Sequence, residues 1–458
     1  MDIVKGEETI MELVKNEEYI VDIVDMGING EGIAKIDNYP IFIKNAIKGE
    51  KVKILLIKKG TNFGIGKVLE IIVSSQDRQN PFCSVYGKCG GCELQHIVYE
   101  KQLEYKMNMV KNNFRKFGLD ENKIIDIIGM ENPYCYRNKA QYPFGISKSM
   151  QIVTGFYAQR SHNIIENDVC KIENEKSEKI VKYILEYVKE NNISIYDEEN
   201  NEGYLRHVVI KVGVSTNEIM VVFVTNSGEN MLEGIVKKLA KEFEEIKTIV
   251  QNVNTKNSNV IMGDNNIILY GNGTIEDKIG QYTFKISALS FYQVNPIQTK
   301  KLYDKAKEYI GSANILFDLY CGIGTIGIYC SDIASKVYGI EIVSQAIDNA
   351  KENAGINNIQ NIEFLVGKAE DKIDELYNKN ILADTVLVDP PRKGLDKKLI
   401  DTLLEKEPNK IVYISCNNAT LARDLKLLEE KYELKECTLV DMFPHTSHVE
   451  CIAVLELK

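Results

Sequence analysis

Apolar residues recur along the chain in three different patterns, which divide it into three regions. Between residues 17 and 73, five short runs rich in Val and Ile are separated by Gly, Asn and Pro. Such runs predict strands, and the breaks between them predict tight turns. Five short strands at this spacing indicate a small OB-like β-barrel, an architecture that often presents a surface to single-stranded nucleic acid.

The apolar spacing becomes helical after residue 100. Side chains separated by four and then three positions predict one apolar face of a helix that ends at Gly118. These side chains are Leu103, Met107, Val110, Phe114 and Phe117. We interpret this stripe as a packing surface.

Between residues 124 and 290 both patterns occur together. Strand-like runs at 207–215, 218–225 and 265–271 mix with amphipathic stretches such as 176–190. This mixture predicts an α+β central domain.

From about residue 293, strand-like runs alternate regularly with helical stretches. The runs are 314–320, 336–341, 362–367, 384–391 and 410–415. Regular alternation predicts a doubly wound, mostly parallel sheet with helices on both faces, which makes this region an α/β, Rossmann-like domain. The chain of 458 residues therefore predicts three domains, at 9–73, 74–292 and 293–458.

Composition is that of an ordinary soluble protein, with 44% hydrophobic and 27% charged residues. No apolar run approaches the roughly 18 residues of a membrane span. The first residues carry charges throughout and lack the apolar stretch of a signal peptide. We therefore expect a cytoplasmic protein that does not contact membranes.

The charge is distributed unevenly. The net charge is −10, but residues 38–148 hold 18 Lys and Arg against 10 Asp and Glu. Seven of these lysines lie within the predicted barrel: Lys44, Lys48, Lys51, Lys53, Lys58, Lys59 and Lys67. A basic half beside an acidic remainder permits RNA binding, although a run of charges is usually just a solvated face.

A glycine-rich loop follows the first strand of the C-terminal domain. Gly322, Gly324 and Gly327 satisfy the GxGxxG pattern, which allows close backbone approach to a nucleotide-like ligand. Asp318 at the strand tip would repel a diphosphate and suit a cationic ligand, and Glu341 at the end of the next strand can accept ribose hydroxyls. The pattern favours S-adenosylmethionine over a dinucleotide, although Asp318 can also serve as a helix cap.

Reactive side chains stand at two further strand ends. Asp389 begins a rigid Asp-Pro-Pro-Arg exit, and Cys416 precedes a helix that Asn417 or Asn418 can cap. Because a helix N-terminus favours the thiolate, we expect a lowered pKa for Cys416. Glu450, just before the last strand, is the candidate for acid–base chemistry, whereas we interpret His445 and His448 as structural.

Ten cysteines in a cytoplasmic chain favour thiol chemistry or metal ligation over disulfides. Cys83, Cys89 and Cys92 lie around a pair of glycines, and Cys170 is the best candidate for a fourth ligand. Four thiolates suit Zn²⁺ or a [4Fe–4S] cluster, and their spacing alone does not separate these.

Five motifs of this chain resemble, in the same order, those of bacterial RNA uracil-5-methyltransferases. They are SFYQVN at 290–295, DLYCGIGT at 318–325, VDPPR at 388–392, ISCNNATLARD at 414–424 and DMFPHTSHVE at 441–450. The predicted N-terminal barrel is similar to the TRAM domain of the same enzymes. Any one motif is weak evidence, but the ordered set is highly specific.

This resemblance implies roles for particular residues. Cys416 is the implied nucleophile, Glu450 the proton acceptor, and S-adenosylmethionine is contacted by Gln293, Tyr320, Glu341 and Asp389. The cysteine spacing resembles the iron–sulfur motif of the ribosomal-RNA branch, which implies [4Fe–4S] rather than zinc and 23S rRNA rather than the tRNA T-loop. The strand before VDPPR lacks the second cysteine of RNA cytosine-5-methyltransferases, which implies uracil.

Two other classes of function compete with this interpretation. One is an iron–sulfur oxidoreductase that binds a dinucleotide at the glycine loop. The other is a non-catalytic RNA-binding assembly factor with a relict methyltransferase fold. We expect neither DNA nor an obligate protein partner, and the sequence does not indicate which uridine is modified or the oligomeric state.

Overall fold

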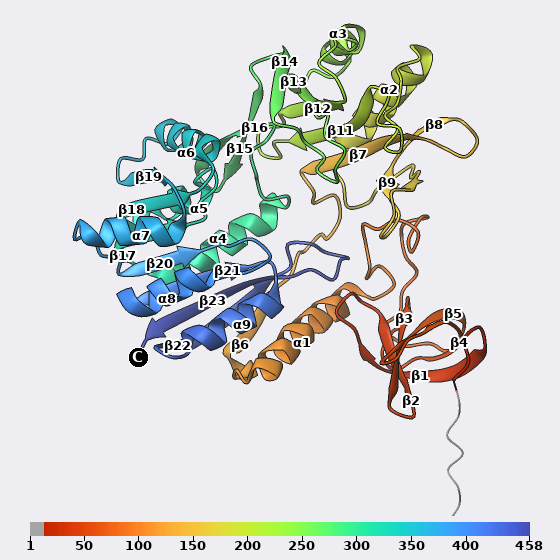
Figure 1. Ribbon diagram of the computed structural model, residues 1–458, viewed down its shortest axis with the longest axis horizontal. Helices are drawn as coiled ribbons and strands as arrows, with labels where there is room; N and C mark the ends of the chain where they lie inside the picture. The colour runs from red at the N-terminus through yellow and green to blue at the C-terminus, as the bar shows by residue number, and fades with distance from the viewer. Residues whose placement is uncertain (1–12) are drawn as a thin grey trace, which may run out of the picture. The chain divides into compact units, whose positions relative to one another are not determined.

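The computed structural model describes residues 13–458, which form two compact units (Figure 1). The first comprises the chain up to Met109 together with His445–Ser447, and the second comprises Val110–Pro444 and His448–Lys458. The first four residues of the predicted N-terminal domain, 9–12, lie outside the described part. Among the described residues, no helix has the length and apolarity needed to span a bilayer.

A closed five-stranded barrel fills most of the first unit and confirms the predicted fold of this region. Its strands are β1 (Glu18–Met26), β2 (Gly32–Ile36), β3 (Tyr39–Lys44), β4 (Lys51–Lys59) and β5 (Gly64–Val73). They are ordered β1-β2-β3-β5-β4, with β3 and β5 parallel. Alternate side chains of each strand point inward, as Tyr19, Val21 and Ile23 of β1 show, so the interior is a packed apolar core.

A buried ion pair ties the barrel to the segment that follows it. Glu50, whose side chain is fully buried, accepts hydrogen bonds from Nε and Nη2 of Arg78 at 2.6 and 2.8 Å. Burial raises the pKa of the Glu50 carboxyl, but the Arg78 hydrogen bonds and the Ile47 amide hold it below its usual value. The carboxyl is therefore ionised at neutral pH.

Helix α1 (Tyr99–Phe117) begins in the first unit and ends in the second. Gly118 adopts φ +71°, and the amide of Leu119 donates to the Phe114 carbonyl at 2.9 Å, as in a Schellman C-cap. The predicted end of the helix is confirmed.

The second unit contains a mixed sheet of six strands, ordered β14-β13-β12-β11-β7-β8. These strands are β7 (Lys139–Ile146), β8 (Ile152–Thr154), β11 (Leu205–Val212), β12 (Ile219–Thr225), β13 (Ile246–Val253) and β14 (Asn265–Tyr270). Helices α2 (Glu175–Glu190) and α3 (Glu233–Glu242) pack on one face. Two short pairs complete this region, β9 (Phe156–Tyr157) with β10 (Ile164–Ile165), and β15 (Thr274–Ile279) with β16 (Tyr282–Ser287).

An eight-stranded sheet, ordered β19-β18-β17-β20-β21-β23-β22-β6, forms the larger layer of this unit. Its strands from the C-terminal region are β17 (Ala313–Leu319), β18 (Ala334–Glu341), β19 (Ile362–Val366), β20 (Thr385–Val388), β21 (Lys410–Ser415), β22 (Tyr432–Val440) and β23 (Glu450–Leu457). Strands β17 to β21 are parallel, and β23 runs antiparallel between β21 and β22. The predicted doubly wound sheet is confirmed.

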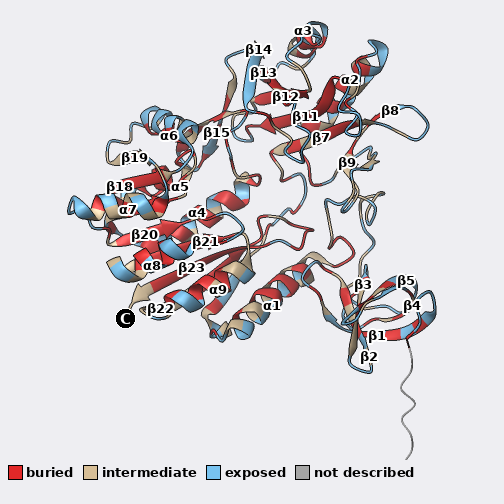
Figure 2. Ribbon diagram, viewed as in Figure 1, coloured by how far each residue is buried: buried red, intermediate tan, exposed pale blue. Residues whose placement is uncertain are grey.

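Helices cover both faces of the sheet (Figure 1). On one face lie α4 (Pro296–Ile310), α5 (Thr325–Tyr329) and α6 (Ser344–Ile356), whose apolar side chains share a buried core with the sheet. On the other lie α7 (Ala369–Asn378), α8 (Lys397–Lys406) and α9 (Asn418–Leu428). Figure 2 shows the central strands of this sheet buried and the outward faces of the helices exposed.

The last strand of the eight-stranded sheet comes from a distant part of the chain. Strand β6 (Ile124–Ile128) lies within the range 74–292 predicted for the central domain, but it pairs in parallel with β22 at the sheet edge. The amide of Asp441 continues this pairing by donating to the Ile128 carbonyl at 3.0 Å. Strand β6 thereby supplies hydrogen-bond partners to the outer edge of β22. No local pattern in the sequence predicts this pairing.

Candidate active site

Four loops meet at the carboxyl edge of the parallel strands. They follow β17, β18, β20 and β21, and they carry the four motifs singled out at strand ends in the sequence. Because parallel strands end at a common edge, residues far apart in the chain are placed together. Each predicted catalytic or cofactor-binding residue except Gln293 and Glu450 lies in one of these loops or at the strand end before it.

The loop after β17 turns sharply into α5. Tyr320 and the glycines Gly322 and Gly324 have φ of +64°, +53° and +79°, and an added Cβ at Gly322 would meet nothing within 4 Å. The backbone is therefore open to close approach at Gly322, as a nucleotide-like ligand requires. Tyr320 is partly buried, and burial together with nearby carboxylates raises its pKa to about 12.

Asp318 lies beneath this loop. Only 1% of it is exposed, and its Oδ2 accepts the Gly327 amide of α5 at 2.9 Å. Burial raises the pKa of this carboxyl to about 8, and the charges of Asp389 and Glu341 add to the effect. The Asp318 carboxyl therefore holds the first turn of α5 in place, which favours the helix-cap interpretation of this residue.

Glu341 ends β18, as the sequence predicts. Its Oε2 accepts the Gly322 amide at 3.3 Å, and its Oε1 accepts the Val343 amide at 3.0 Å. The carboxylate thus connects the tip of β18 to the glycine loop.

Gln293 stands between β16 and α4. Its carbonyl accepts Nδ2 of Asn138 at 2.9 Å, and the next carbonyl, of Val294, accepts the Asn138 amide at 2.9 Å. Buried Lys211 of β11 donates to the carbonyls of Ser287 and Ser290, both at 2.9 Å. The central sheet therefore fixes the backbone on which Gln293 stands.

Cys416 and Glu450 lie opposite each other at the ends of two antiparallel neighbours. Strand β21 pairs Ser415 with Cys451 of β23, so the next position places Cys416 across from Glu450. Glu450 is buried, with 6% exposure, whereas Cys416 is half-buried. The sheet thus brings together two residues separated by a helix and a strand.

The pKa of Cys416 is raised, not lowered. Burial raises it to about 11, and the charges of Glu450 and Asp389 add to this. Asn417 caps α9 as predicted, accepting the amides of Ala419 and Thr420 at 3.1 and 3.4 Å. The prediction of a lowered pKa is wrong because burial and two acidic neighbours outweigh the helix N-terminus.

The acidic neighbours are themselves held towards their neutral forms. Burial raises the pKa of Glu450 to about 8, and the charge of Asp389 contributes. Burial also raises the pKa of Asp389 to about 7. Arg392 opposes these effects by lowering the pKa of both Cys416 and Glu450. The cluster is therefore deficient in positive charge, which suits a cationic ligand.

Sequence reasoning missed Arg392 as a separate member of the site. The signal was present, because an arginine follows the two prolines after Asp389. Lys211 was also missed as a residue that supports the site. A basic residue near the end of a mostly apolar strand was the sequence signal that could have indicated it. Asn138 carries no such local signal.

The predicted metal ligands are divided between the two units of the chain. Cys83, Cys89, Cys92 and Cys170 are all partly exposed, and Cys170 belongs to the second unit. Within residues 13–458, no group of three or more His, Cys, Asp or Glu side chains is arranged to hold a metal ion. The remaining cysteines are buried, apart from half-buried Cys416 and exposed Cys135.

The doubly wound sheet, the glycine loop and the acidic cluster at its carboxyl edge define the class of S-adenosylmethionine-dependent methyltransferases. A family model described as tRNA (uracil-5-)-methyltransferase matches residues 98–458, and a TRAM domain model matches residues 13–69. The chain belongs to this methyltransferase family and carries an N-terminal TRAM domain, and it is an RNA methyltransferase specific for uracil C5.

Relatives of the same length support the assignment. An uncharacterized RNA methyltransferase of Clostridium acetobutylicum is 48% identical over 98% of this chain and 99% of its own length. An uncharacterized RNA methyltransferase of Bacillus cereus is 46% identical over 97% of this chain and 98% of its own length. Among solved structures, the tRNA (uracil-54, C5)-methyltransferase of Pyrococcus abyssi, in complex with S-adenosyl-L-homocysteine, has a TM-score of 0.78 at 29% identity, covering 95% of this chain and 100% of that one.

The acidic cluster fits S-adenosylmethionine, whose sulfonium and ammonium groups are cationic. Asp389 and Glu341 raise the pKa of Asp318, and Asp389 raises that of Glu450, so one positive ligand charge would relieve several repulsions. A dinucleotide would place a diphosphate against the same carboxyls. The oxidoreductase alternative therefore disagrees with both the site and the family.

Proposed function

We propose that the protein methylates C5 of a uridine in 23S rRNA, with Cys416 as the covalent nucleophile and Glu450 as the proton acceptor. The observation that carries this proposal is the pairing of a half-buried thiol with a buried carboxyl at the ends of β21 and β23. The basic residue Arg392 acts electrostatically on both of them.

The chemistry explains why a thiol and a carboxyl stand together. Uracil C5 is a weak nucleophile, so attack of the Cys416 thiolate on C6 first moves the C5–C6 electron pair into the C4 carbonyl as an enolate. S-adenosylmethionine supplies the electrophilic methyl group when bound. Once C5 carries both methyl and hydrogen, Glu450 in its ionised form takes the C5 proton, and the released electron pair reforms the C5–C6 double bond as the C6–S bond breaks and the thiolate leaves.

Four residues are proposed to hold the cofactor. Glu341 and Tyr320 flank the open backbone at Gly322, Asp389 lies among the acidic groups, and Gln293 stands on a fixed segment. Glu341 would accept ribose hydroxyls, and Asp389 would face the cationic part of the ligand.

RNA must present an unstacked uridine to reach Cys416, so we expect a flipped-out or single-stranded base. The choice of 23S rRNA rests on the barrel and the cysteine spacing. The alternative is a T-loop uridine of tRNA, and the Pyrococcus abyssi neighbour is a tRNA (uracil-54, C5)-methyltransferase. Mapping 5-methyluridine by mass spectrometry in ribosomal and transfer RNA from cells lacking the protein decides between them.

The resemblance of the cysteine spacing to the iron–sulfur motif of the ribosomal-RNA branch supports a [4Fe–4S] cluster on Cys83, Cys89, Cys92 and Cys170, with zinc as the alternative. Because the described residues are not arranged around a metal, this proposal rests on the sequence alone, and no step of methyl transfer depends on it. Anaerobically purified protein should contain about four irons per chain. Zinc, or no metal, would contradict the cluster.

The covalent step is tested with RNA that contains 5-fluorouridine, because fluorine at C5 cannot leave as a cation and the adduct persists. Cys416→Ala should bind S-adenosylmethionine yet form no adduct that survives denaturing electrophoresis. Cys135→Ala removes an exposed thiol and serves as the control. An adduct with Cys416→Ala would exclude Cys416 as the nucleophile.

A further inference from the structure

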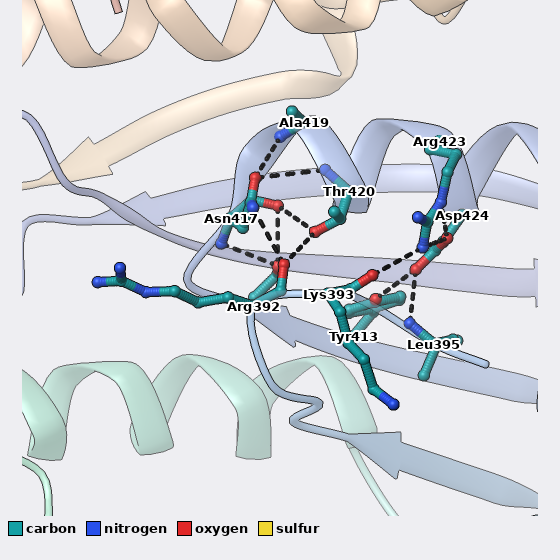
Figure 3. A network of polar contacts seen from close by, with 10 residues as sticks. Arg392, Lys393, Leu395, Tyr413, Asn417, Ala419, Thr420, Arg423 and Asp424 are labelled. Atoms are coloured by element: carbon teal, nitrogen blue, oxygen red, sulfur yellow. Dashed lines mark hydrogen bonds and ion pairs between the residues drawn. The ribbon is translucent and has the colours of Figure 1, made fainter. Parts of the chain in front are cut away.

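A polar network joins the loop after β20 to the start of α9 (Figure 3). The loop carries Arg392, and α9 follows directly on Cys416 and Asn417. Nδ2 of Asn417 donates to the Arg392 carbonyl at 3.0 Å, and Oγ1 of Thr420 donates to the same oxygen at 3.3 Å. Two side chains of α9 and its cap therefore bind the backbone of the arginine.

Asp424 is the centre of the rest of the network. Its side chain is fully buried, and its Oδ2 accepts the Tyr413 hydroxyl and the Leu395 amide, both at 2.8 Å. Its Oδ1 accepts Nε of Arg423 at 2.7 Å, and Nη2 of Arg423 donates to the Lys393 carbonyl at 3.0 Å. Both carboxylate oxygens are thus used to hold the loop, either directly or through Arg423.

The loop is shaped to receive this carboxylate. Gly394 adopts φ +79°, and an added Cβ there would lie 2.5 Å from Oδ2 of Asp424 and 2.6 Å from Nη2 of Arg423. Only glycine allows the loop to approach α9 this closely. The Gly394 amide donates to the Pro391 carbonyl at 2.9 Å, which closes a turn around Arg392 and Lys393.

The side chain of Arg392 is not part of the network and extends away from it in Figure 3. The network holds only the backbone of Arg392. It therefore fixes the position of the Arg392 Cα without neutralising the guanidinium charge. Arg392 is the basic residue whose charge acts on both Cys416 and Glu450.

We propose that Asp424 is a positioning residue that, through Arg423, Tyr413 and the Leu395 amide, holds the loop against α9 and keeps Arg392 beside Cys416 and Glu450. The inference rests on the proposed role of Cys416. Asp389 lies before the held segment, joined directly to β20, so binding of S-adenosylmethionine should be largely independent of Asp424.

The test is the pH dependence of Cys416 alkylation by iodoacetamide, measured by mass spectrometry of the Cys416 peptide. The groups that act on this thiol are Glu450 and Asp389, which raise its pKa, and Arg392, which lowers it. In Asp424→Asn the alkylation midpoint should move to higher pH, because Arg392 is released. If the substitution acted only by removing the negative charge of Asp424, the alkylation midpoint of Cys416 would instead move to lower pH. The direction of the shift therefore distinguishes release of Arg392 from a direct effect of the lost charge.

A double-mutant cycle tests whether Asp424 acts on Cys416 through Arg392. Arg392→Gln should raise the midpoint as Asp424→Asn does, and the double variant should show no further rise. In Asp424→Asn, kcat should fall about 10- to 100-fold with KM for S-adenosylmethionine little changed. The matched control is Glu429→Gln. Glu429 lies just past the end of α9, and its carboxylate accepts a hydrogen bond from Lys426. This substitution should change neither the alkylation midpoint nor kcat.

Additive shifts, or an unchanged midpoint in a folded Asp424→Asn protein, would overturn the proposal. Should Asp424→Asn not fold, Arg423→Gln and Thr420→Val carry the same cycle, because Arg423 is 43% exposed. Alkylation needs no methyl transfer, so the cycle gives its answer even if Cys416→Ala proves active and the proposed function fails.

Discussion

At the scale of single residues, the site is a balance of charges around one thiol. A free cysteine is only a few per cent ionised at neutral pH, and here burial with two carboxyls moves Cys416 further from ionisation. At neutral pH the neutral thiol therefore predominates strongly over the thiolate in the free protein. Formation of the thiolate then requires a change in the burial of Cys416 or in the charges of its neighbours Glu450, Asp389 and Arg392.

The first prediction concerns the reactivity of Cys416 in the free protein. Its pKa of about 11 implies that iodoacetamide alkylation rises about tenfold per pH unit between pH 7 and 10. Glu450→Gln should move the midpoint to lower pH, because it removes a neighbouring negative charge. Peptide mass spectrometry measures both, and a midpoint near pH 8 in the unmodified chain would contradict the charge balance.

The second prediction concerns the proton acceptor. Glu450→Gln keeps the size of the side chain but cannot take a proton, so elimination should stop after methyl transfer. A methylated covalent RNA–protein intermediate should accumulate, and turnover should fall about 100-fold or more. Denaturing electrophoresis with a labelled methyl group detects the intermediate. Ordinary turnover by this variant would mean that another base acts.

At the scale of elements, the sequence predicts what local patterns determine. Strand and helix periods, the end of α1 at Gly118 and the Asn417 cap were all predictable, because each depends on neighbouring residues. The position of β6 was not, because pairing with β22 is a contact across the chain. The raised pKa of Cys416 was missed for the same reason, since Asp389 lies in another loop and Glu450 in another strand.

Lys211 shows how one element supports another. It lies in the buried strand β11, and its ammonium binds the segment before Gln293. Burial, together with a smaller effect of the nearby Lys139 charge, lowers its pKa to about 7. The folded state therefore disfavours the proton that an unfolded lysine retains up to about pH 10.

The third prediction follows from this linkage. Between about pH 7 and 10 the unfolded state binds more protons at Lys211 than the folded state, so this residue makes the free energy of unfolding rise with pH. Below pH 7 both states are protonated and the contribution is constant. Urea unfolding of Lys211→Met should therefore show a shallower rise from pH 7 to 9.5. Lys247→Met, an exposed lysine of β13, should keep the original slope, and equal slopes for all three proteins would contradict the prediction.

At the scale of the whole molecule, an acidic protein must still bind a polyanion. The net charge of −10 is offset locally, because the region 38–148 is basic. On the barrel, Phe63 is 41% exposed, packs edge-on against Phe42 at 5.7 Å, and has Nζ of Lys58 at 5.9 Å from its ring centre. An exposed aromatic ring beside lysines suits a stacked base and its phosphates.

The last prediction tests whether this part of the barrel binds RNA. Phe63→Ala should weaken binding of a single-stranded RNA by about 1–3 kcal/mol if a base stacks on the ring. Lys58→Gln with Lys59→Gln should instead reduce the slope of log K against log salt by about 0.7 for each phosphate that these side chains no longer neutralise. Fluorescence anisotropy at several salt concentrations measures both effects, and KM for S-adenosylmethionine should not change. Lys237→Gln, which removes a charge of the central helix α3, is the control with unchanged slope. Equal RNA affinity in Phe63→Ala and the unmodified protein would place the binding surface elsewhere.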